Sequence, residues 1–230
     1  MVRMIEAIFP SGPSKSASAF LAPAADPLIT CAHIVANEQG QRASRVFVSG
    51  NGIKRYEAEL VSVDESYDLA SLKIGEGKQP SKGSSELPEV GEQVIFAGQP
   101  AGVAKLSVFP GMTSAAGPGL LSKPSCDLIQ IAGMVNNGNS GGPLVNAEGK
   151  ILGVITAKYV PLLREIDQLT AHLANIPQFP RDVVLGQVDF SAFVNVTIKS
   201  MWQLGAVLRL VQVGIGWAVP AKYLSKVGGE

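Results

Sequence analysis

The segment Gly138–Val145, which reads GNSGGPLV, constrains this chain more than any other feature. Three glycines surround Ser140, and glycine adopts backbone conformations that strain other residues. Such a backbone can expose the Ser140 hydroxyl while the amides of Gly138 and Ser140 point together at an oxygen that becomes negatively charged. The segment is therefore a candidate nucleophile with a candidate oxyanion hole, although a glycine-rich turn between two strands explains the same letters.

A serine hydroxyl is a weak nucleophile, so this chemistry needs a histidine base and a carboxylate that orients the histidine. The chain has two histidines, and His33 ends the apolar run PLITCAH, which indicates the end of a strand. Asp68 opens the run DLASLKI, in which apolar residues alternate with small or polar ones. Taken singly, a buried structural histidine and a turn-forming aspartate explain both residues. In the order His33, Asp68, Ser140 they predict a catalytic triad.

These residues and their surroundings resemble the trypsin/chymotrypsin-fold serine proteases, most closely the HtrA (Deg) type. The resemblance implies that His33 is the general base, Asp68 its orienting acid and Ser140 the nucleophile, with the amides of Gly138 and Ser140 as the oxyanion hole. It implies a serine endopeptidase that acts on peptides or proteins through an acyl-enzyme. The resemblance runs from about residue 16 to residue 224 and rests on segments 18–21, 29–35, 58–64, 68–70, 90–100, 138–145, 152–157 and 214–220.

The rhythm of strands and turns predicts an all-β fold. Short strand-like runs separated by Gly, Asn, Ser and Pro clusters have the spacing of small barrels. The resemblance makes these two packed six-stranded β-barrels of the chymotrypsin type, residues 1–100 carrying His33 and Asp68 and residues 101–230 carrying Ser140. The active site is then expected in the cleft between the barrels. The runs cover residues 45–49, 56–63, 69–74 and 93–97 in the first lobe, and 105–109, 128–132, 144–145 and 151–157 in the second.

Residues 160–212 interrupt the strand rhythm with apolar residues at helical spacing, which predicts a two-helix insertion. In the family, the segments on either side of this insertion form the walls of the specificity pocket. The insertion could therefore be a lid over the pocket or a docking site for a partner, or it could be a brace that only adds hydrophobic core. His172 lies off the apolar stripe and has no Cys, Asp or Glu at a convincing ligand spacing. We therefore expect no metal site at His172, and no cofactor.

The specificity pocket can be placed only by alignment with the family. Its floor falls near Met134 and its walls near Thr156, Ala157, Gly214 and Gly216, and no carboxylate is evident among them. Burying a lysine or arginine without a counter-charge costs several kcal/mol or so. We therefore expect cleavage after small or aliphatic residues.

Charge and composition narrow the partners and the compartment. Nineteen basic and nineteen acidic residues balance without any block of like charge, which favours neither a nucleic acid nor an anionic membrane as a partner. Arg209 and Gln212 interrupt the most apolar stretch, so no spanning helix is expected. An acid and a proline fall within the first ten residues, where a secretory signal needs an apolar run. Cys31 and Cys126 occupy positions that are unpaired in the family, so we expect reduced thiols and a cytoplasmic location.

Activation is expected to differ from that of pancreatic-type relatives, which place an aspartate where this chain has Asn139. The resemblance to HtrA-like enzymes implies that loop order controls the oxyanion hole, so that a regulatory partner or a homo-oligomer could gate activity. Two alternatives remain open. One is a partner-gated effector protease of a larger defence or signalling system, and the other is a module that binds extended peptides without cutting them.

Overall fold

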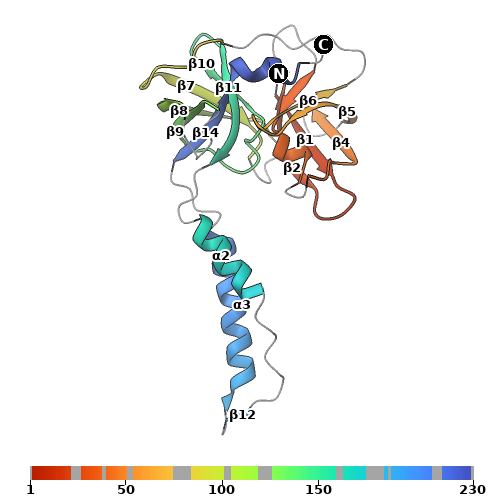
Figure 1. The fold of residues 1–230 in the computed structure, drawn as a ribbon, viewed down its shortest axis with the longest axis vertical. Coiled ribbons are helices and arrows are strands. Elements are labelled where there is room, and N and C mark those ends of the chain that lie inside the picture. Colours follow the sequence, from red (N-terminus) through yellow and green to blue (C-terminus); the bar gives the residue numbers. More distant parts are fainter. Residues whose placement is uncertain are drawn as a thin grey trace. The chain divides into compact units, whose positions relative to one another are not determined.

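The computed structural model describes residues 2–21, 27–37, 40–50, 54–74, 84–100, 105–118, 126–158, 163–174, 184–185, 188–208 and 214–228. The chain divides into two compact units (Figure 1). One unit joins residues 1–159 with residues 214–230, and the other is the insertion, residues 160–213. The first unit holds both β-barrels and all of the predicted catalytic residues.

The first barrel closes from six antiparallel strands in the order β1-β2-β3-β6-β5-β4. The strand β1 lies outside the strand-like runs expected from sequence, yet its alternation buries Ile5 and Ala7 completely. A single helical turn, α1 (Ala32–Val35), follows β3 and carries His33. The strands are β1 (Val2–Ile8), β2 (Lys15–Phe20), β3 (Leu28–Thr30), β4 (Arg45–Gly50), β5 (Lys54–Asp64) and β6 (Leu69–Lys73).

The second barrel also closes from six antiparallel strands, in the order β10-β11-β14-β9-β8-β7. The two closed barrels confirm the predicted all-β, chymotrypsin-like fold class. A 3₁₀ helix, η2 (Ala221–Lys226), follows the last strand. The strands are β7 (Gln93–Gly98), β8 (Ser107–Gly117), β9 (Leu128–Gly133), β10 (Pro143–Asn146), β11 (Ile151–Lys158) and β14 (Ile215–Pro220).

The strand β7 corrects the predicted boundary between the barrels. Residues 93–97 were expected in the first lobe, which was drawn as residues 1–100. Instead β7 pairs with β8 and β10, as in the register of Phe96 opposite Phe109 and Leu144. Phe96 is fully buried in the core of the second barrel. Alternation along a strand tells which face is buried but not which distant strand is the partner, so the boundary lies before Gln93.

One of the two hydrophobic clusters runs through both barrels. Buried residues of the first barrel, such as Leu69 and Ile29, belong to the same cluster as Val154 and Trp217 of the second. Burial of apolar area across both barrels favours their association. The junction between them is therefore a packed interface that can hold side chains from both barrels at fixed positions.

The inserted unit is helical, as the sequence predicts. It contains α2 (Leu163–Ala174), α3 (Phe190–Leu208) and a short hairpin of β12 (Val184–Leu185) and β13 (Val188–Asp189). Ile166 and Leu173 are buried in α2, and Gly205 permits close approach, since a Cβ there would lie 2.8 Å from Thr170 Cγ2. Leu162 and Ile176 of the predicted stripe lie outside the described residues.

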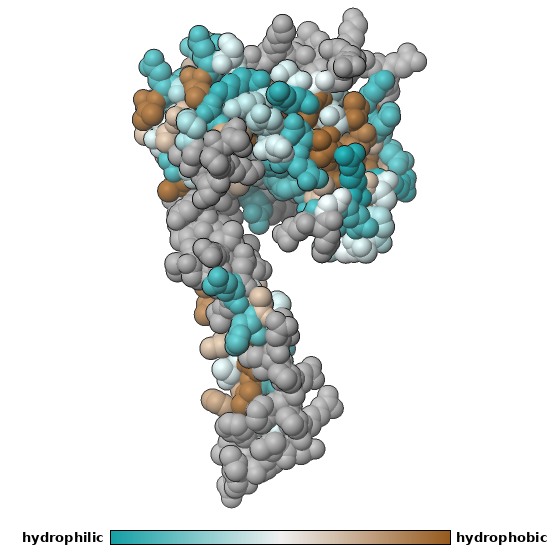
Figure 2. Space-filling model, viewed as in Figure 1, coloured by the Kyte–Doolittle hydropathy of each residue, from teal (hydrophilic) through white to brown (hydrophobic). Residues whose placement is uncertain are grey.

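Much of the apolar surface of α3 is exposed. The exposed side chains include Phe193, Val196, Leu204 and Val207, and Figure 2 shows hydrophobic surface on this unit. Across the described residues, every helix is too short or too polar to cross a membrane.

Candidate active site

His33 stands on α1, the helical turn that follows β3 of the first barrel. Its neighbours Ala32, Ile34 and Val35 are buried, whereas 44% of the His33 side chain is exposed. Lys15 Nζ donates hydrogen bonds to the carbonyl oxygens of His33 (2.5 Å) and Ala36 (3.1 Å). These contacts hold the short helical turn in place and leave the imidazole at the surface.

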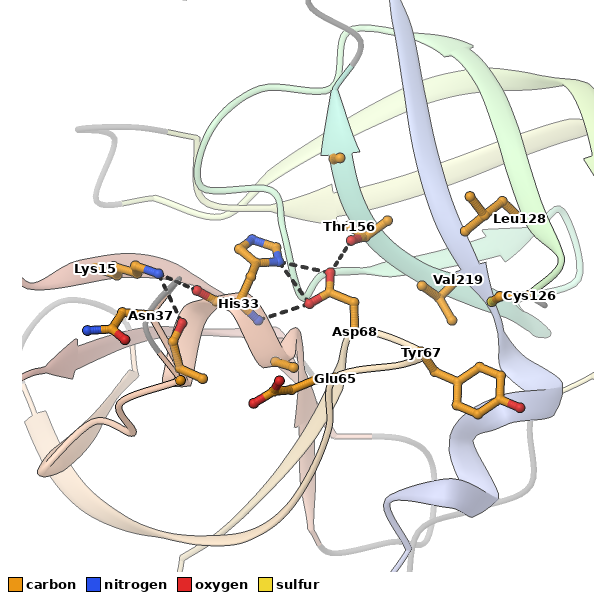
Figure 3. Close-up of a pocket in the computed structure, with 14 residues that line it drawn as sticks. Lys15, His33, Asn37, Glu65, Tyr67, Asp68, Cys126, Leu128, Thr156 and Val219 are labelled. Atoms are coloured by element: carbon orange, nitrogen blue, oxygen red, sulfur yellow. Dashed lines mark hydrogen bonds and ion pairs between the residues drawn. The ribbon is translucent and has the colours of Figure 1, made fainter. Parts of the chain in front are cut away.

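Asp68 holds His33 through two groups at once. The backbone amide of His33 donates to Asp68 Oδ1 at 2.9 Å, and His33 Nδ1 lies 2.8 Å from Asp68 Oδ2 and 3.0 Å from Oδ1. The Thr156 hydroxyl also donates to the Asp68 carboxylate. Figure 3 shows Asp68 between the imidazole and Thr156. The carboxylate is 87% shielded from solvent, since only 13% of the side chain is exposed.

The charge of Asp68 decides which nitrogen of His33 carries the proton. Burial raises the pKa of Asp68, but the hydrogen bonds and charge of His33 and the Thr156 hydroxyl outweigh burial and hold this pKa below its ordinary value of 3.8. Asp68 is therefore ionised at neutral pH and can only accept hydrogen bonds. In the neutral imidazole Nδ1 then donates to Asp68, which leaves Nε2 as the acceptor.

The serine turn, residues 136–140, has the backbone geometry that its glycine predicts. The amide of Asn139 donates to the carbonyl of Asn136 at 3.0 Å, and Gly138 has a φ of 93° at the third position of this turn. A positive φ at the third position, with none at Asn137 in the second, fits a type II turn and favours glycine or asparagine at Gly138. Within the described part of the chain, the amides of Gly138 and Ser140 donate to no backbone carbonyl.

The Ser140 hydroxyl is bonded to Thr156. Ser140 Oγ donates to the carbonyl oxygen of Thr156 at 2.9 Å, and among the described residues no hydrogen bond joins Ser140 to His33. Thr156 thus touches both ends of the predicted triad, because its hydroxyl reaches Asp68 and its carbonyl reaches Ser140. Sequence reasoning placed Thr156 only in a pocket wall, and its spacing from Asp68 carried no signal of this contact.

Two further residues support the serine turn without having been predicted. Ser18 of β2 donates to the carbonyl oxygens of Gly138 and Ser140. Gly141 has a φ of 82° and lies so close to Ser18 that a Cβ there would overlap the Ser18 carbonyl oxygen. The glycine next to the serine is therefore required by packing as well as by backbone conformation.

The predicted specificity residues lie at one end of the second barrel. The structure differs from the prediction at the pocket floor, which was expected at Met134. Met134 is 53% exposed, whereas the next residue, Val135, is 1% exposed. A Cβ on Gly216 would overlap the Val135 side chain, so Val135 occupies the space beside this glycine. Gly214 has a φ of 72°, and its carbonyl accepts the Gly133 amide at 2.8 Å.

A cavity of about 590 Å³ lies beside the imidazole and the carboxylate (Figure 3). The polar side chains of Lys15 and Asn37 line it near His33, and the apolar side chains of Leu128 and Val219 line its other part (Figure 3). A chain segment bound against His33 would meet side chains of both barrels. The lining residues are Lys15, Ala32, His33, Ala36, Asn37, Gly40, Glu65, Tyr67, Asp68, Cys126, Leu128, Thr156, Ala157 and Val219.

Cys31, His33 and Asp68 bring potential metal-ligand atoms within 4.8 Å of one another. A metal would require the Cys31 thiolate. Burial and, next to it, the charge of Asp68 raise the pKa of Cys31 well above its ordinary value, and Cys31 Sγ lies 3.2 Å from the Ile155 carbonyl as a donor. The cluster is therefore better described as a protonated thiol packed behind the His33–Asp68 pair.

His172, the other histidine, is exposed in the last turn of α2. It belongs to the inserted unit and not to the unit that holds His33. A histidine on an exposed helix face needs no functional explanation.

The chain is similar in sequence to known proteases. Residues 17–154 match the family model described as a trypsin-like peptidase domain. The chain is 35% identical over 153 residues to serine protease HTRA1 of Xenopus laevis, covering 64% of this chain and 32% of that protein. It is 33% identical over 152 residues to a probable periplasmic serine endoprotease, DegP-like, of Hahella chejuensis, covering 65% of this chain and 31% of that protein.

Solved structures resemble the fold. The active form of the Rv3671c protease from M. tuberculosis matches with a TM-score of 0.56 and 29% identity, covering 69% of this chain and 70% of that chain. The HtrA-type protease AlgW with a tripeptide matches with a TM-score of 0.61 and 24% identity, covering 98% of this chain and 57% of that chain. This chain spans about a third of the length of the HTRA1 and DegP-like relatives. With a matching model across most of both barrels, the chain belongs to the family of trypsin-like peptidase domains.

Proposed function

We propose that the chain is a serine endopeptidase in which Ser140 is the nucleophile, His33 the general base and Asp68 the residue that orients the base. One observation carries the proposal. The Asp68 carboxylate bonds both the Nδ1 and the backbone amide of His33, in a unit where the amides of Gly138 and Ser140 donate to no backbone carbonyl among the described residues. The two arrangements complement each other chemically, because one supplies an oriented base and the other supplies donors for an oxyanion.

The reaction follows from these positions. Ser140 Oγ turns from the Thr156 carbonyl towards His33 and attacks the substrate carbonyl carbon, while His33 Nε2 takes the hydroxyl proton. The amides of Gly138 and Ser140 stabilise the oxyanion that forms. His33 then gives its proton to the leaving amine, and water hydrolyses the acyl-enzyme by the same steps. Asp68 keeps Nδ1 protonated and stabilises the imidazolium that appears during each step.

For specificity, we propose cleavage after small or aliphatic residues. Val135 occupies the space beside Gly216, and Met134, Val135 and Gly216 offer no carboxylate to a basic side chain. A peptide library should therefore show alanine or valine, and not arginine or lysine, before the cleaved bond. A profile dominated by basic residues would contradict the proposal, and Val135→Gly should admit larger side chains if Val135 limits the depth of the pocket.

Labelling with a fluorophosphonate probe, combined with cleavage of unfolded casein, tests the proposed activity. The wild-type chain should react with the probe and cut casein, whereas Ser140→Ala should do neither. Ser225→Ala, which removes an exposed hydroxyl from η2, is the matched control and should behave as wild type. Labelling that persists in Ser140→Ala would exclude Ser140 as the nucleophile.

A partner-gated protease is the second candidate, supported by the Ser140 hydroxyl being bonded to the Thr156 carbonyl and not to His33. In this case a regulatory partner or a second copy of the chain would favour the conformer in which Ser140 faces His33. Slow labelling that accelerates at higher chain concentration, or on addition of a partner, distinguishes gating from constitutive activity. A module that binds peptides without cutting them would bind casein and leave the probe unreacted.

A further inference from the structure

Ser18 is a buried polar residue whose hydrogen bonds converge on the serine turn. Its side chain is fully buried on β2 of the first barrel. Its hydroxyl donates to the Gly138 carbonyl oxygen at 2.7 Å, and its amide donates to the Ser140 carbonyl oxygen at 2.9 Å. The same hydroxyl accepts the Gln99 amide at 2.9 Å. The hydroxyl and the backbone amide of Ser18 therefore both find their partners in the backbone of the second barrel.

These contacts restrain the backbone on both sides of the Ser140 amide. Peptide groups are planar, so fixing the Gly138 carbonyl also fixes the plane that contains the Asn139 amide, and fixing the Ser140 carbonyl does the same for Gly141. The Ser140 amide lies between these two held planes. An oxyanion hole stabilises a transition state only when its donors are already in position. Ser18 restrains the backbone that carries the Ser140 amide and that begins next to the Gly138 amide.

Packing around Ser18 leaves little room for the turn to adjust. A Cβ added at Gly98 would lie 2.9 Å from Ser18 Oγ and 2.9 Å from Asn139 Oδ1, and one added at Gly141 would overlap the Ser18 carbonyl oxygen. Gly98 ends β7, and Gln99 follows it. The Ser18 hydroxyl, which reaches over from the first barrel, thus bonds both the residue after β7 and the serine turn of the second barrel.

We propose that the Ser18 hydroxyl is a positioning group for the oxyanion hole, acting from the first barrel on the serine turn of the second. The proposal rests on the proposed function of Ser140 and its neighbouring amides. Removing the hydroxyl leaves the partly buried Gly138 carbonyl and Gln99 amide without their partner. Because such groups must find other partners, the turn is expected to rearrange, and the two donors then no longer converge.

Steady-state kinetics of Ser18→Ala on a short peptide ester test the proposal. Loss of one oxyanion donor typically lowers the rate about 10²- to 10³-fold, so displacement of a donor should lower kcat about 10- to 100-fold with KM changed less than about threefold. The affinity for a peptide boronate, which forms a tetrahedral adduct with serine, should fall by a similar factor.

Thr30→Val is the matched control. Thr30 is also fully buried, and its hydroxyl donates to the Ser18 carbonyl at 2.8 Å. It packs beside Gly141 but, among the described residues, makes no hydrogen bond to residues 136–140. It should lower the Tm as Ser18→Ala does while keeping kcat within about twofold of wild type. If Ser18→Ala does not fold, Ser18→Cys, which keeps the size but donates weakly, is judged by the same criterion.

The outcomes separate this proposal from the proposed function. Ser18→Ala with kcat equal to that of Thr30→Val, in a chain whose Ser140→Ala variant is inactive, would overturn the role of Ser18 and leave the protease assignment intact. Retained turnover in Ser140→Ala would overturn both. A selective loss of kcat and of boronate affinity in Ser18→Ala supports the proposal.

Discussion

The ring of Tyr67 stacks on the ring of Tyr223, with centroids 4.3 Å apart and planes inclined by 27°. Tyr67 immediately precedes Asp68, and Tyr223 lies in η2 after the second barrel. The Tyr223 hydroxyl accepts the Asp127 amide at 3.2 Å, and Lys222 forms an ion pair with the Asp127 carboxylate. The stack therefore connects the turn that carries the predicted orienting acid to an anchored C-terminal turn.

The support matters because Asp68 has a φ of 54°, the one positive φ of a non-glycine residue in the described ranges. Asp64 Oδ1 accepts the amides of Ser66 and Tyr67 at 3.0 and 3.2 Å, which closes the turn on itself. The Tyr67 side chain also lines the cavity beside Asp68, so without its partner the ring has space to move into.

Tyr223→Leu should destabilise the chain by about 1 kcal/mol, because it removes an aromatic pair, and should lower kcat several-fold through the Asp68 turn. Tyr223→Phe keeps the ring and should stay within about twofold of wild type in kcat. Urea unfolding and steady-state kinetics measure the two effects. Tyr56→Leu, at a half-exposed tyrosine of β5, is the control, and an equal loss of kcat in Tyr56→Leu would contradict the link to Asp68.

Asp68→Asn should lower kcat by about 10⁴-fold while leaving the chain folded. An asparagine can donate to Nδ1, which favours the tautomer that places the proton on Nε2 and removes the base for Ser140. Single-turnover acylation with an activated ester isolates this step, and circular dichroism checks the fold. A loss below about tenfold would show that Asp68 does not orient His33.

The stability conferred by Asp68 should depend on pH in a defined direction. Its pKa is lowered in the folded chain, against the raising effect of burial, by His33 and Thr156. The ionised carboxylate then stabilises the folded state fully above its unfolded pKa of about 3.9, and this contribution is lost as the pH falls through the lower folded pKa. The free energy of unfolding of wild type minus that of Asp68→Asn should therefore be larger at pH 7 than at pH 3. Urea titrations at the two pH values measure the difference, and an increase in acid would reverse the sign.

Gly141→Ala and Gly149→Ala form a matched pair that separates packing from backbone conformation. Both glycines have a positive φ, 82° and 78° respectively, but a Cβ at Gly141 overlaps the Ser18 carbonyl, whereas one at Gly149 meets nothing within 4 Å. Gly149→Ala should cost about 1 kcal/mol of unfolding free energy from backbone strain. Gly141→Ala should cost more than about 3 kcal/mol and abolish activity. Equal costs would mean that the close approach to Ser18 is relieved at little expense.

Both cysteines should be unreactive in the folded chain. Cys31 and Cys126 are buried and reduced, and burial, followed by the charge of Asp68, raises the pKa of Cys31. Iodoacetamide should label neither thiol in native buffer and both in urea, as measured by intact mass. Rapid native labelling of Cys31 would show that the site behind His33 opens. The cytoplasmic location expected from the sequence stays a prediction.

Local patterns accounted for much of the fold. The alternation around residues 45–74 and 128–157 predicted strands because a barrel strand buries every second side chain, and the 3.6-residue spacing in 160–212 predicted helices. The strand β1 was missed because its seven residues mix charged and apolar side chains. The assignment of β7 to the wrong barrel had a different cause, since pairing depends on partners such as Leu144 that are distant along the chain.

The sequence by itself determined the chemical types at the site, with His33, Asp68 and Ser140 in an order and local context that few other folds share. Glycines around Ser140 also carried their own signal, because a positive φ is a local property of the backbone. Only the tertiary structure decided that Ser18 and Thr156 bind the serine turn and the carboxylate, that Val135 and not Met134 is buried against Gly216, and that Tyr223 supports the turn of Asp68. Each of these contacts joins residues that are far apart in the sequence. They arise when two barrels close and pack together, and no short window of sequence contains that information.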